Sequence, residues 1–360
     1  MKRVYNFAAG PATMPPKVLE TAANEMLCFG DSGMSVMEMT HRGKAYQDIF
    51  DETIHLIRNL MQIPDSYEIL LLQGGATGQF AAIPLNLMTD YASADYIDSG
   101  NFAHGALVEA QKYGTVRVVA SSREENYVRV PEFDPAVFDP KADYFYITTN
   151  NTIYGTRYHI LPDTGSVPLV ADASSNILSE VFDITRFGVL FAGAQKNIGP
   201  AGVTLVIVRK DLLGRPSPLT PKVWDWTLQA KQGSMLNTPP TYAIYLCGLC
   251  LKWLEEQGGV AAIEKINIEK SKMLYEFLDE SALFNGIAQP ISRSRMNVTF
   301  RTKDPELDAL FVKEATAAGL CNVKGHRAAG GMRASIYNAM PVEGVISLIQ
   351  FMKDFEVRNK

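Results

Sequence analysis

One lysine of this sequence has unusual neighbours. Lys196 lies between Gln195 and Asn197, shortly after an apolar run at 189–192 and just before the Gly-Pro-Ala-Gly stretch 199–202. Small residues and glycines let a ligand approach the chain closely, and a lysine at the end of a buried strand can serve as an amine nucleophile. The alternative is an ordinary surface lysine in a loop, and this segment alone leaves both interpretations open.

A carboxylate occupies a similar position upstream. The apolar run 169–171 ends in Asp172, which is followed by Ala-Ser-Ser. Open α/β sheets bind ligands at the carboxyl ends of their strands, so Asp172 and Lys196 are expected to face one ligand. Pyridoxal phosphate needs this pair, a lysine for an imine and a carboxylate that keeps the pyridine nitrogen protonated. Taken alone, Asp172 is equally explained as a helix N-cap or a turn residue.

A glycine-rich turn offers a place for a phosphate. The segment 70–80 reads as a strand, a Gly-Gly-Ala-Thr-Gly turn at 74–78 and the start of a helix. Free N–H groups at a helix N-terminus favour a phosphate, and glycines allow the backbone to reach it. The pattern is neither the dinucleotide fingerprint nor a P-loop, so it is weak by itself. It gains value as the third part that pyridoxal phosphate requires.

Histidine and arginine occur in adjacent pairs at two places. The pairs are His41-Arg42 and His326-Arg327, and Arg333 follows the second pair beyond Gly330-Gly331. The planar fork of arginine matches carboxylates and phosphates, so these cations could converge on a doubly anionic substrate. As isolated dipeptides they would be surface charges.

The elements that would position these residues alternate between strand and helix. Apolar residues at three- and four-residue steps predict a helix over 46–60, and helix-compatible segments follow at 79–88 and 103–113. Short apolar runs bounded by Gly, Asn or Asp predict seven strands. This alternation predicts an α/β fold with a mainly parallel seven-stranded sheet covered on both faces. The predicted strands are 68–73, 96–98, 116–120, 144–148, 169–171, 189–192 and 203–208.

A second, smaller domain is expected after a helix at 241–256. The Gln-Gly-Gly stretch 257–259 is typical of a helix C-cap and indicates a boundary. We therefore predict an N-terminal arm at 1–15, a large α/β domain at 16–257 and a small α+β domain at 258–360. Within the small domain the pattern predicts helices at 260–280, 305–318 and 341–355, and strands at 295–300 and 332–337.

Composition excludes several classes of protein. The chain has 360 residues and a net charge of −5 with scattered basic residues, so neither nucleic acid nor a membrane surface is an expected partner. No secretion signal or membrane span is apparent, which predicts a cytoplasmic protein. The Cys247-x-x-Cys250 motif lies inside a predicted helix, where a redox pair is not expected. The four cysteines are therefore predicted to be buried thiols rather than metal ligands.

Taken together, these segments resemble the phosphoserine aminotransferase family, whose members are class-V, fold-type-I pyridoxal phosphate enzymes with the aspartate aminotransferase superfold. The resemblance covers essentially the whole chain and is highly specific. It is carried by the stretches 6–11, 39–43, 193–202, 237–240, 324–327 and 330–341.

The resemblance implies a role for each matching residue. Lys196 would hold the cofactor and move the proton, and Asp172 would pair with the ring nitrogen. The cofactor would also be bound by Ala76, Thr77, Phe102, Thr152, Gln195, Asn237 and Thr238. The substrate would be bound by Ala9, His41, Arg42, His326, Arg327 and Arg333. Three of these positions depart from the family pattern, with Phe102 in place of tryptophan, Ala9 in place of serine and Thr77 in place of arginine or serine.

The implied reaction is reversible amino transfer between glutamate and 3-phosphohydroxypyruvate, which gives 2-oxoglutarate and 3-phosphoserine for serine biosynthesis. A phosphorylated hydroxythreonine in vitamin B6 synthesis is a further implied substrate. The resemblance also implies a homodimer in which Asn237 and Thr238 reach the cofactor of the partner subunit. The nearest alternatives are serine:glyoxylate aminotransferase and cysteine desulfurase on the same fold. A nucleotide-dependent dehydrogenase would explain the glycine-rich turn but not the pair formed by Asp172 and Lys196.

Overall fold

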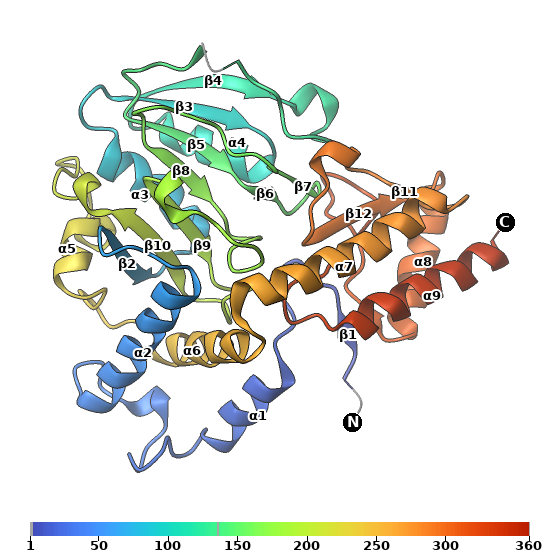
Figure 1. Cartoon of the computed structure of the whole chain (residues 1–360), viewed down its shortest axis with the longest axis horizontal. Helices are drawn as coiled ribbons and strands as arrows, with labels where there is room; N and C mark the ends of the chain where they lie inside the picture. The colour runs from blue at the N-terminus through green and yellow to red at the C-terminus, as the bar shows by residue number, and fades with distance from the viewer. Residues whose placement is uncertain (1–2, 135–136, 360) are drawn as a thin grey trace.

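A seven-stranded sheet forms the centre of the larger part of the molecule (Figure 1). The computed structural model describes residues 3–134 and 137–359. The strand order is β2-β10-β9-β8-β5-β3-β4, in which β10 runs antiparallel to both of its neighbours and the other pairs are parallel. The predicted mainly parallel sheet is thus confirmed. The strands are β2 (Tyr67–Leu72), β3 (Ser93–Asp98), β4 (Thr115–Ser121), β5 (Tyr144–Thr148), β8 (Leu169–Asp172), β9 (Val189–Gly193) and β10 (Thr204–Arg209).

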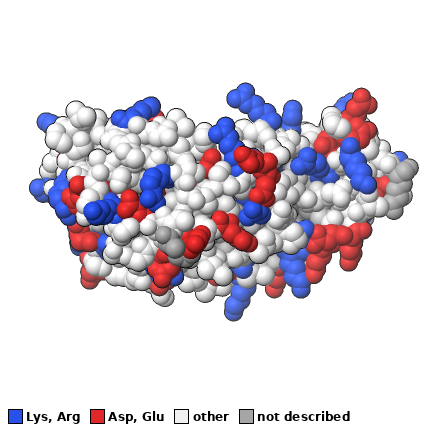
Figure 2. Space-filling model, turned by 90° about the horizontal axis from the view of Figure 1, so that it is seen from above, with Lys and Arg blue, Asp and Glu red and all other residues white. Residues whose placement is uncertain are grey.

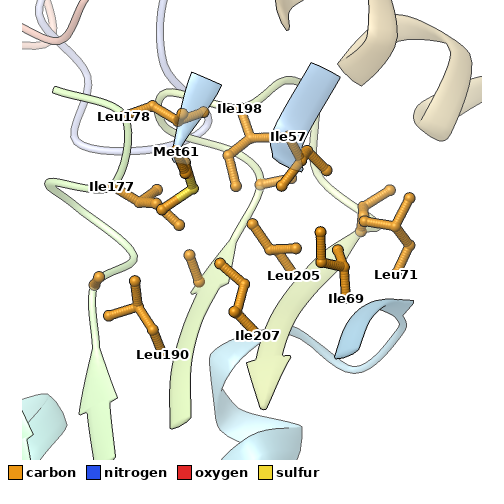
Figure 3. Packing of buried hydrophobic residues seen from close by; sticks show 14 of the residues in the cluster. Ile57, Met61, Ile69, Leu71, Ile177, Leu178, Leu190, Ile198, Leu205 and Ile207 are labelled. Carbon is orange, nitrogen blue, oxygen red and sulfur yellow. The ribbon is translucent and has the colours of Figure 1, made fainter. Parts of the chain in front are cut away.

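Helices cover both faces of this sheet because its central strands are apolar on both sides. Along β2, alternate residues point in opposite directions, so Ile69 and Leu71 join one core while Leu70 and Leu72 join the other. The first core lies under α2 (Lys44–Leu60) and α6 (Thr241–Glu256), and Figure 3 shows Ile57 and Met61 above the strand residues. The second core lies under α3 (Gly75–Leu87), α4 (Asn101–Ala110) and α5 (Trp226–Lys231).

The C-terminal residues build a separate core around a small antiparallel sheet, at the end of the molecule that Figure 1 colours orange and red. The long helix α7 connects the two parts, because Val260 and Ile263 belong to the core under α2 while Leu274 and Leu278 belong to the C-terminal core. The elements are α7 (Gly259–Glu280), β11 (Asn285–Gly286), β12 (Asn297–Arg301), α8 (Pro305–Ala317), β13 (Leu320–Cys321), β14 (Met332–Ser335) and α9 (Val342–Arg358).

The N-terminal arm belongs in space to this C-terminal part. Its short strand β1 (Tyr5–Asn6) pairs in parallel with β13, and Phe7 is fully buried in the C-terminal core. The helix α1 (Pro16–Asn24) then leads the chain back to α6, and the two-stranded ribbon β6 (Asn150–Asn151) and β7 (Thr156–Arg157) follows β5. The arm therefore crosses between the two parts of the molecule.

The cysteine prediction holds for two residues and is wrong for another. Cys247 and Cys250 are buried in α6, but Cys28 is exposed and Cys321 is half-buried. Cys28 follows α1 in a loop where no apolar neighbours cover it, whereas the helical pair faces the core. On the face shown in Figure 2, acidic and basic side chains are interspersed. Within residues 3–134 and 137–359, no helix is long and apolar enough to cross a membrane.

Replacing Ile207, which is fully buried on β10, by alanine should lower the free energy of unfolding by about 2–5 kcal/mol, because the central sheet cannot close the cavity. Urea unfolding of the purified variant measures this change. The matched control is Ile160→Ala, since Ile160 is 85% exposed and its truncation should cost no more than about 0.5 kcal/mol. Equal effects of the two substitutions would contradict the assigned core.

Candidate active site

Three neighbouring parallel strands deliver polar side chains to one edge of the sheet. Asp172 is the last residue of β8, Lys196 follows the end of β9 by three residues, and Thr152 follows β5 and β6. The strand order β9-β8-β5 places these ends side by side. The Lys196 Nζ donates a hydrogen bond of 2.7 Å to the Thr152 Oγ1, and the buried Asp172 accepts one of 2.8 Å from the Ser174 backbone N–H. The structure therefore brings together the two residues singled out first.

Burial shifts the pKa values of Lys196 and Asp172 in opposite directions. It lowers the pKa of Lys196 from 10.5 to about 8, helped by the positive charge of Arg333 and opposed by the carboxylate of Asp172. Burial raises the pKa of Asp172, while hydrogen bonds from Ser174 and the charge of Lys196 act to lower it. An amine with such a pKa is partly neutral near physiological pH, which a nucleophile requires. A buried carboxylate in this position favours a cationic partner.

The glycine-rich turn forms an anion-binding helix terminus. Gly74 and Gly75 adopt positive φ angles of 94° and 64°, a left-handed conformation that favours glycine, and α3 begins there without a side-chain cap. The N–H groups of Ala76 and Thr77 lie in the first turn, where helix geometry provides no acceptor. The positive end of the helix dipole adds to this effect. The turn therefore offers backbone donors to a phosphate.

One further segment lies beside this terminus, and Gln195 lies close to Lys196. The Gln73 Nε2 donates to the Thr238 carbonyl oxygen at 3.2 Å, which places the exposed segment of Asn237 and Thr238 beside the turn. The side chain of Gln195 folds back over Gly193, where an added Cβ would come within 2.5 Å of its Oε1. Gly193 thus gives Gln195 room next to Lys196.

An aromatic face lies near the lysine. Phe102, in the first turn of α4, is 41% exposed, and the Lys196 Nζ lies 5.8 Å from the centre of its ring. An exposed ring at the edge of a buried charged site is suited to stack on a flat ligand. The phenyl ring offers a smaller face than the tryptophan that the family pattern predicts.

Arg333 binds the same residue as the lysine, Thr152. Its Nη1 donates to the Thr152 carbonyl oxygen at 3.1 Å, whereas its buried Nε has no hydrogen-bond partner in the described structure. Burial lowers the pKa of this guanidinium. Leaving a buried donor without an acceptor is unfavourable in free energy, so an anionic group that accepts from Arg333 would be stabilised there. Gly10, which follows Ala9, lies beside the lysine, since an added Cβ at Gly10 would come within 3.3 Å of the Lys196 Cγ.

The second histidine and arginine pair lies in the turn that leads into β14. The backbone N–H groups of Ala329 and Gly330 both donate to the His326 carbonyl oxygen, and this makes the turn tight. Burial and the charges of Arg333 and Arg327 lower the pKa of His326. Arg327 and Arg333 therefore make the surroundings of His326 a positive region that an anion would stabilise.

The first pair is not joined to this region within one chain. Arg42 is exposed just before α2, and among the described residues no hydrogen bond or ion pair connects it or His41 with Lys196, Asp172 or Arg333. The His41 Nε2 is buried without a partner. Among the described residues no printed contact joins the two pairs, and their convergence on one substrate stays a prediction.

Sequence reasoning missed several residues that support the site. Ser174 hydrogen-bonds Asp172 through its backbone, and the Tyr337 hydroxyl donates to the Ala9 carbonyl oxygen at 2.7 Å. The serines after Asp172 and the motif around Tyr337 were visible in the sequence, but nothing local indicated their partners. The part of the chain that the structure describes contains no cluster of three or more His, Cys, Asp or Glu residues suited to a metal ion.

Comparisons with known proteins agree with this geometry. The model of the class-V aminotransferases matches residues 4–348. A phosphoserine aminotransferase of Bacillus cereus is 51% identical over 360 residues, covering all of both chains, and one of a Janthinobacterium species is 50% identical over 99% of both. The solved phosphoserine aminotransferase of Bacillus circulans subsp. alkalophilus covers all of both chains at 42% identity with a TM-score of 0.97.

A solved phosphoserine aminotransferase from Trichomonas vaginalis, described as bound to pyridoxal phosphate, covers 98% of this chain and all of its own at 41% identity, with a TM-score of 0.93. The match extends over the whole length and includes both the sheet edge and the anion-binding turn. The chain is therefore a member of the phosphoserine aminotransferase family within the class-V aminotransferases.

Proposed function

We propose that this chain is a phosphoserine aminotransferase that transfers an amino group between L-glutamate and 3-phosphohydroxypyruvate. The products are 2-oxoglutarate and 3-phospho-L-serine. The observation that carries the proposal is that Lys196 and Arg333 both bind Thr152 at one edge of the sheet, with Asp172 near the lysine and a separate positive turn near the arginine. Full-length relatives of about 50% identity bear that name and support the substrate assignment.

The residues present fit pyridoxal phosphate. The uncapped N-terminus of α3, with Ala76 and Thr77, supplies donors for its phosphate, and Asp172 supplies a buried carboxylate for its ring nitrogen. Phe102 offers a ring face, and Lys196 offers an amine of lowered pKa for covalent attachment. When bound, the cofactor supplies an electron sink that makes the α-proton of an amino acid removable.

The side chains of this chain would then perform distinct tasks. The amine of Lys196 would hold the proton that moves to and from the α-carbon of the substrate. Thr152 accepts a hydrogen bond from its ammonium group and so holds it at the site. The free donors of Arg333 would hold a substrate carboxylate, and His326 with Arg327 would hold the more distant anionic group. Because both amino acids would use this site, they must bind in turn, which predicts ping-pong kinetics.

We further propose that two copies of the chain form a homodimer with shared sites. Arg42, Asn237 and Thr238 are exposed on the single chain, so a second chain can reach them. The segment Val36–Glu38 packs against α6, and the Asn237 segment directly precedes that helix, so both groups lie along one part of the molecule. The buried, unpaired His41 Nε2 also lacks an acceptor that a second chain could supply. The cytoplasmic location remains a prediction from the sequence.

The rate at which the apoprotein acquires covalently bound cofactor should rise with pH up to a midpoint of about 8. The pKa of Lys196 is lowered, so the reactive neutral amine is lost as pH falls through this value, by about tenfold for each unit below it. Borohydride trapping followed by mass spectrometry measures the bound fraction against time. Lys196→Ala should show no adduct. A rate that still climbs tenfold between pH 9 and 10 would contradict the lowered pKa.

The enzyme should strongly prefer phosphoserine to serine, roughly by 10⁴-fold in kcat/KM, because serine would leave the cations of the turn unpaired. Arg327→Ala should reduce that preference by about tenfold or more, mainly through loss of activity on phosphoserine. Arg215→Ala is the matched control, since Arg215 pairs with Asp90 on the surface and should leave the preference unchanged. If Arg327→Ala leaves the ratio unaltered, this turn does not recognise the phosphate.

Mixing two inactive variants should restore activity if the sites are shared. Lys196→Ala lacks the amine, and a variant with both Asn237→Ala and Thr238→Ala lacks the segment proposed to act on the partner. Random exchange makes about half of the dimers mixed, each with one intact site, so about a quarter of wild-type activity should return. Verified subunit exchange without recovery would place the segment at the site of its own chain.

A further inference from the structure

A second lysine is buried in this molecule, and the proposed chemistry does not use it. Lys270 on α7 has no exposed surface, and burial lowers its pKa to about 7. Within the described ranges no carboxylate lies at ion-pair distance from its ammonium group. Lysine is almost never fully buried without a partner because removing its charge from water is costly. Its presence here therefore calls for a compensating interaction.

That interaction is a set of three backbone carbonyl groups. The Lys270 Nζ donates to the carbonyl oxygens of Ile336, Tyr337 and Met340 at 3.1, 2.9 and 3.1 Å, which uses all three of its donors. The three acceptors belong to one short connection, residues 336–340, between β14 and α9. Lys270 therefore fixes the shape of this connection from inside the core.

The same face of α7 holds the connection at a second point. Asn267, one turn before Lys270, donates through its Nδ2 to the Asn338 Oδ1 at 2.8 Å and to the Ser179 carbonyl oxygen at 3.0 Å. The backbone N–H of Asn338 donates in turn to the Asn197 Oδ1 at 3.0 Å. The connection is thus clamped between α7 and the residue that follows Lys196.

The connection reaches the substrate side of the site through Tyr337. The fully buried Tyr337 receives a hydrogen bond from Asn297 and donates its own proton to the Ala9 carbonyl oxygen. Among the described residues, this hydrogen bond from Tyr337 fixes the Ala9 carbonyl group, which lies next to Gly10 and Lys196. The backbone N–H of Lys196 donates to the Ala194 carbonyl oxygen in the turn after β9, a bond that does not involve the connection. A shift of 336–340 would act directly on the Ala9 carbonyl group through Tyr337, while this bond of Lys196 would remain.

We propose that Lys270 is a positioning residue for substrate binding, which acts through the connection 336–340 and Tyr337 on the N-terminal arm at Ala9. It touches neither substrate nor cofactor. This inference rests on the proposed transaminase function, since it concerns the binding side of that same site. A purely structural role would change stability without a selective change in substrate binding.

The test replaces Lys270 by methionine, which is similar in length and has no donor. In the holoenzyme, KM for glutamate and for phosphoserine should each rise about tenfold or more, because small displacements of binding groups are costly. The value of kcat should change by less than about threefold, and the absorbance of the bound cofactor and its pH titration should stay as in wild type. The matched control is Lys265→Met on the exposed side of α7, with KM expected to remain within about twofold.

A double-mutant cycle tests whether Lys270 acts on substrate binding through Tyr337. If Lys270 acts through Tyr337, adding Tyr337→Phe to Lys270→Met should raise KM by much less than the product of the two separate effects. Multiplicative effects would overturn the route. If Lys270→Met cannot be purified in folded form, Asn267→Ala serves as the second variant. It removes the hydrogen bond from Asn267 to Asn338 but keeps the three carbonyl groups around Lys270, and the same selective rise in KM is expected.

Unchanged KM values in a folded Lys270→Met or Asn267→Ala variant that has lost only thermal stability would overturn the proposal. This result differs from failure of the proposed function, in which the wild-type holoenzyme itself would not transaminate phosphoserine.

Discussion

The parallel pairing of β8 with β9 is the constraint on which the rest of the site depends. It brings Asp172 and the turn bearing Lys196 to the same edge of the sheet, where Asp172 is buried and Lys196 is half-buried. Each charge would be unfavourable alone in this position, and each shifts the pKa of the other towards its charged form. Thr152 then joins the pair to Arg333 through its hydroxyl and its carbonyl group. The chemistry of the site therefore follows from one strand register.

The site holds more positive charge than its own carboxylates can balance. The Arg333 Nε lacks an acceptor, and burial together with the charges of Arg333 and Arg327 lowers the pKa of His326. Unpaired buried donors and neighbouring positive charges lower the stability of the unliganded protein, and binding of an anion offsets this loss. The uncapped α3 terminus adds donors of the same kind. Cofactor phosphate and an anionic substrate are thus what the local electrostatics favour.

Polar contacts, more than apolar ones, join the two parts of the molecule near the site. Asn150 after β5 donates to Ser175 and to Asn297 of β12, and Asn297 donates onward to Ser335 and Tyr337. Buried networks of this kind require defined geometry, because any unpaired member carries a desolvation cost. They fix how β12 and β14 face the large sheet. The clamp made by Lys270 and Asn267 belongs to the same polar seam, which links substrate-binding groups to the core.

The sequence alone determined the features that depend on local pattern. Its apolar runs and helical spacing predicted seven strands and the main helices, and the residue types at 172, 196 and 74–78 indicated pyridoxal phosphate chemistry. Motifs extending over the whole chain indicated the family. The sequence is sufficient for these features because backbone periodicity, glycine conformation and side-chain chemistry each depend on single residues or on residues close together in the chain.

Only the tertiary structure decided the long-range contacts. The pairing of β1 with β13, the carbonyl groups around Lys270 and the bond from Tyr337 to Ala9 join residues far apart in the chain, and no local pattern encodes such partners. Exposure of Cys28 depended on whether distant segments cover its loop. Spacing along the chain fixes elements and residue types, whereas packing of the whole chain decides which of them meet.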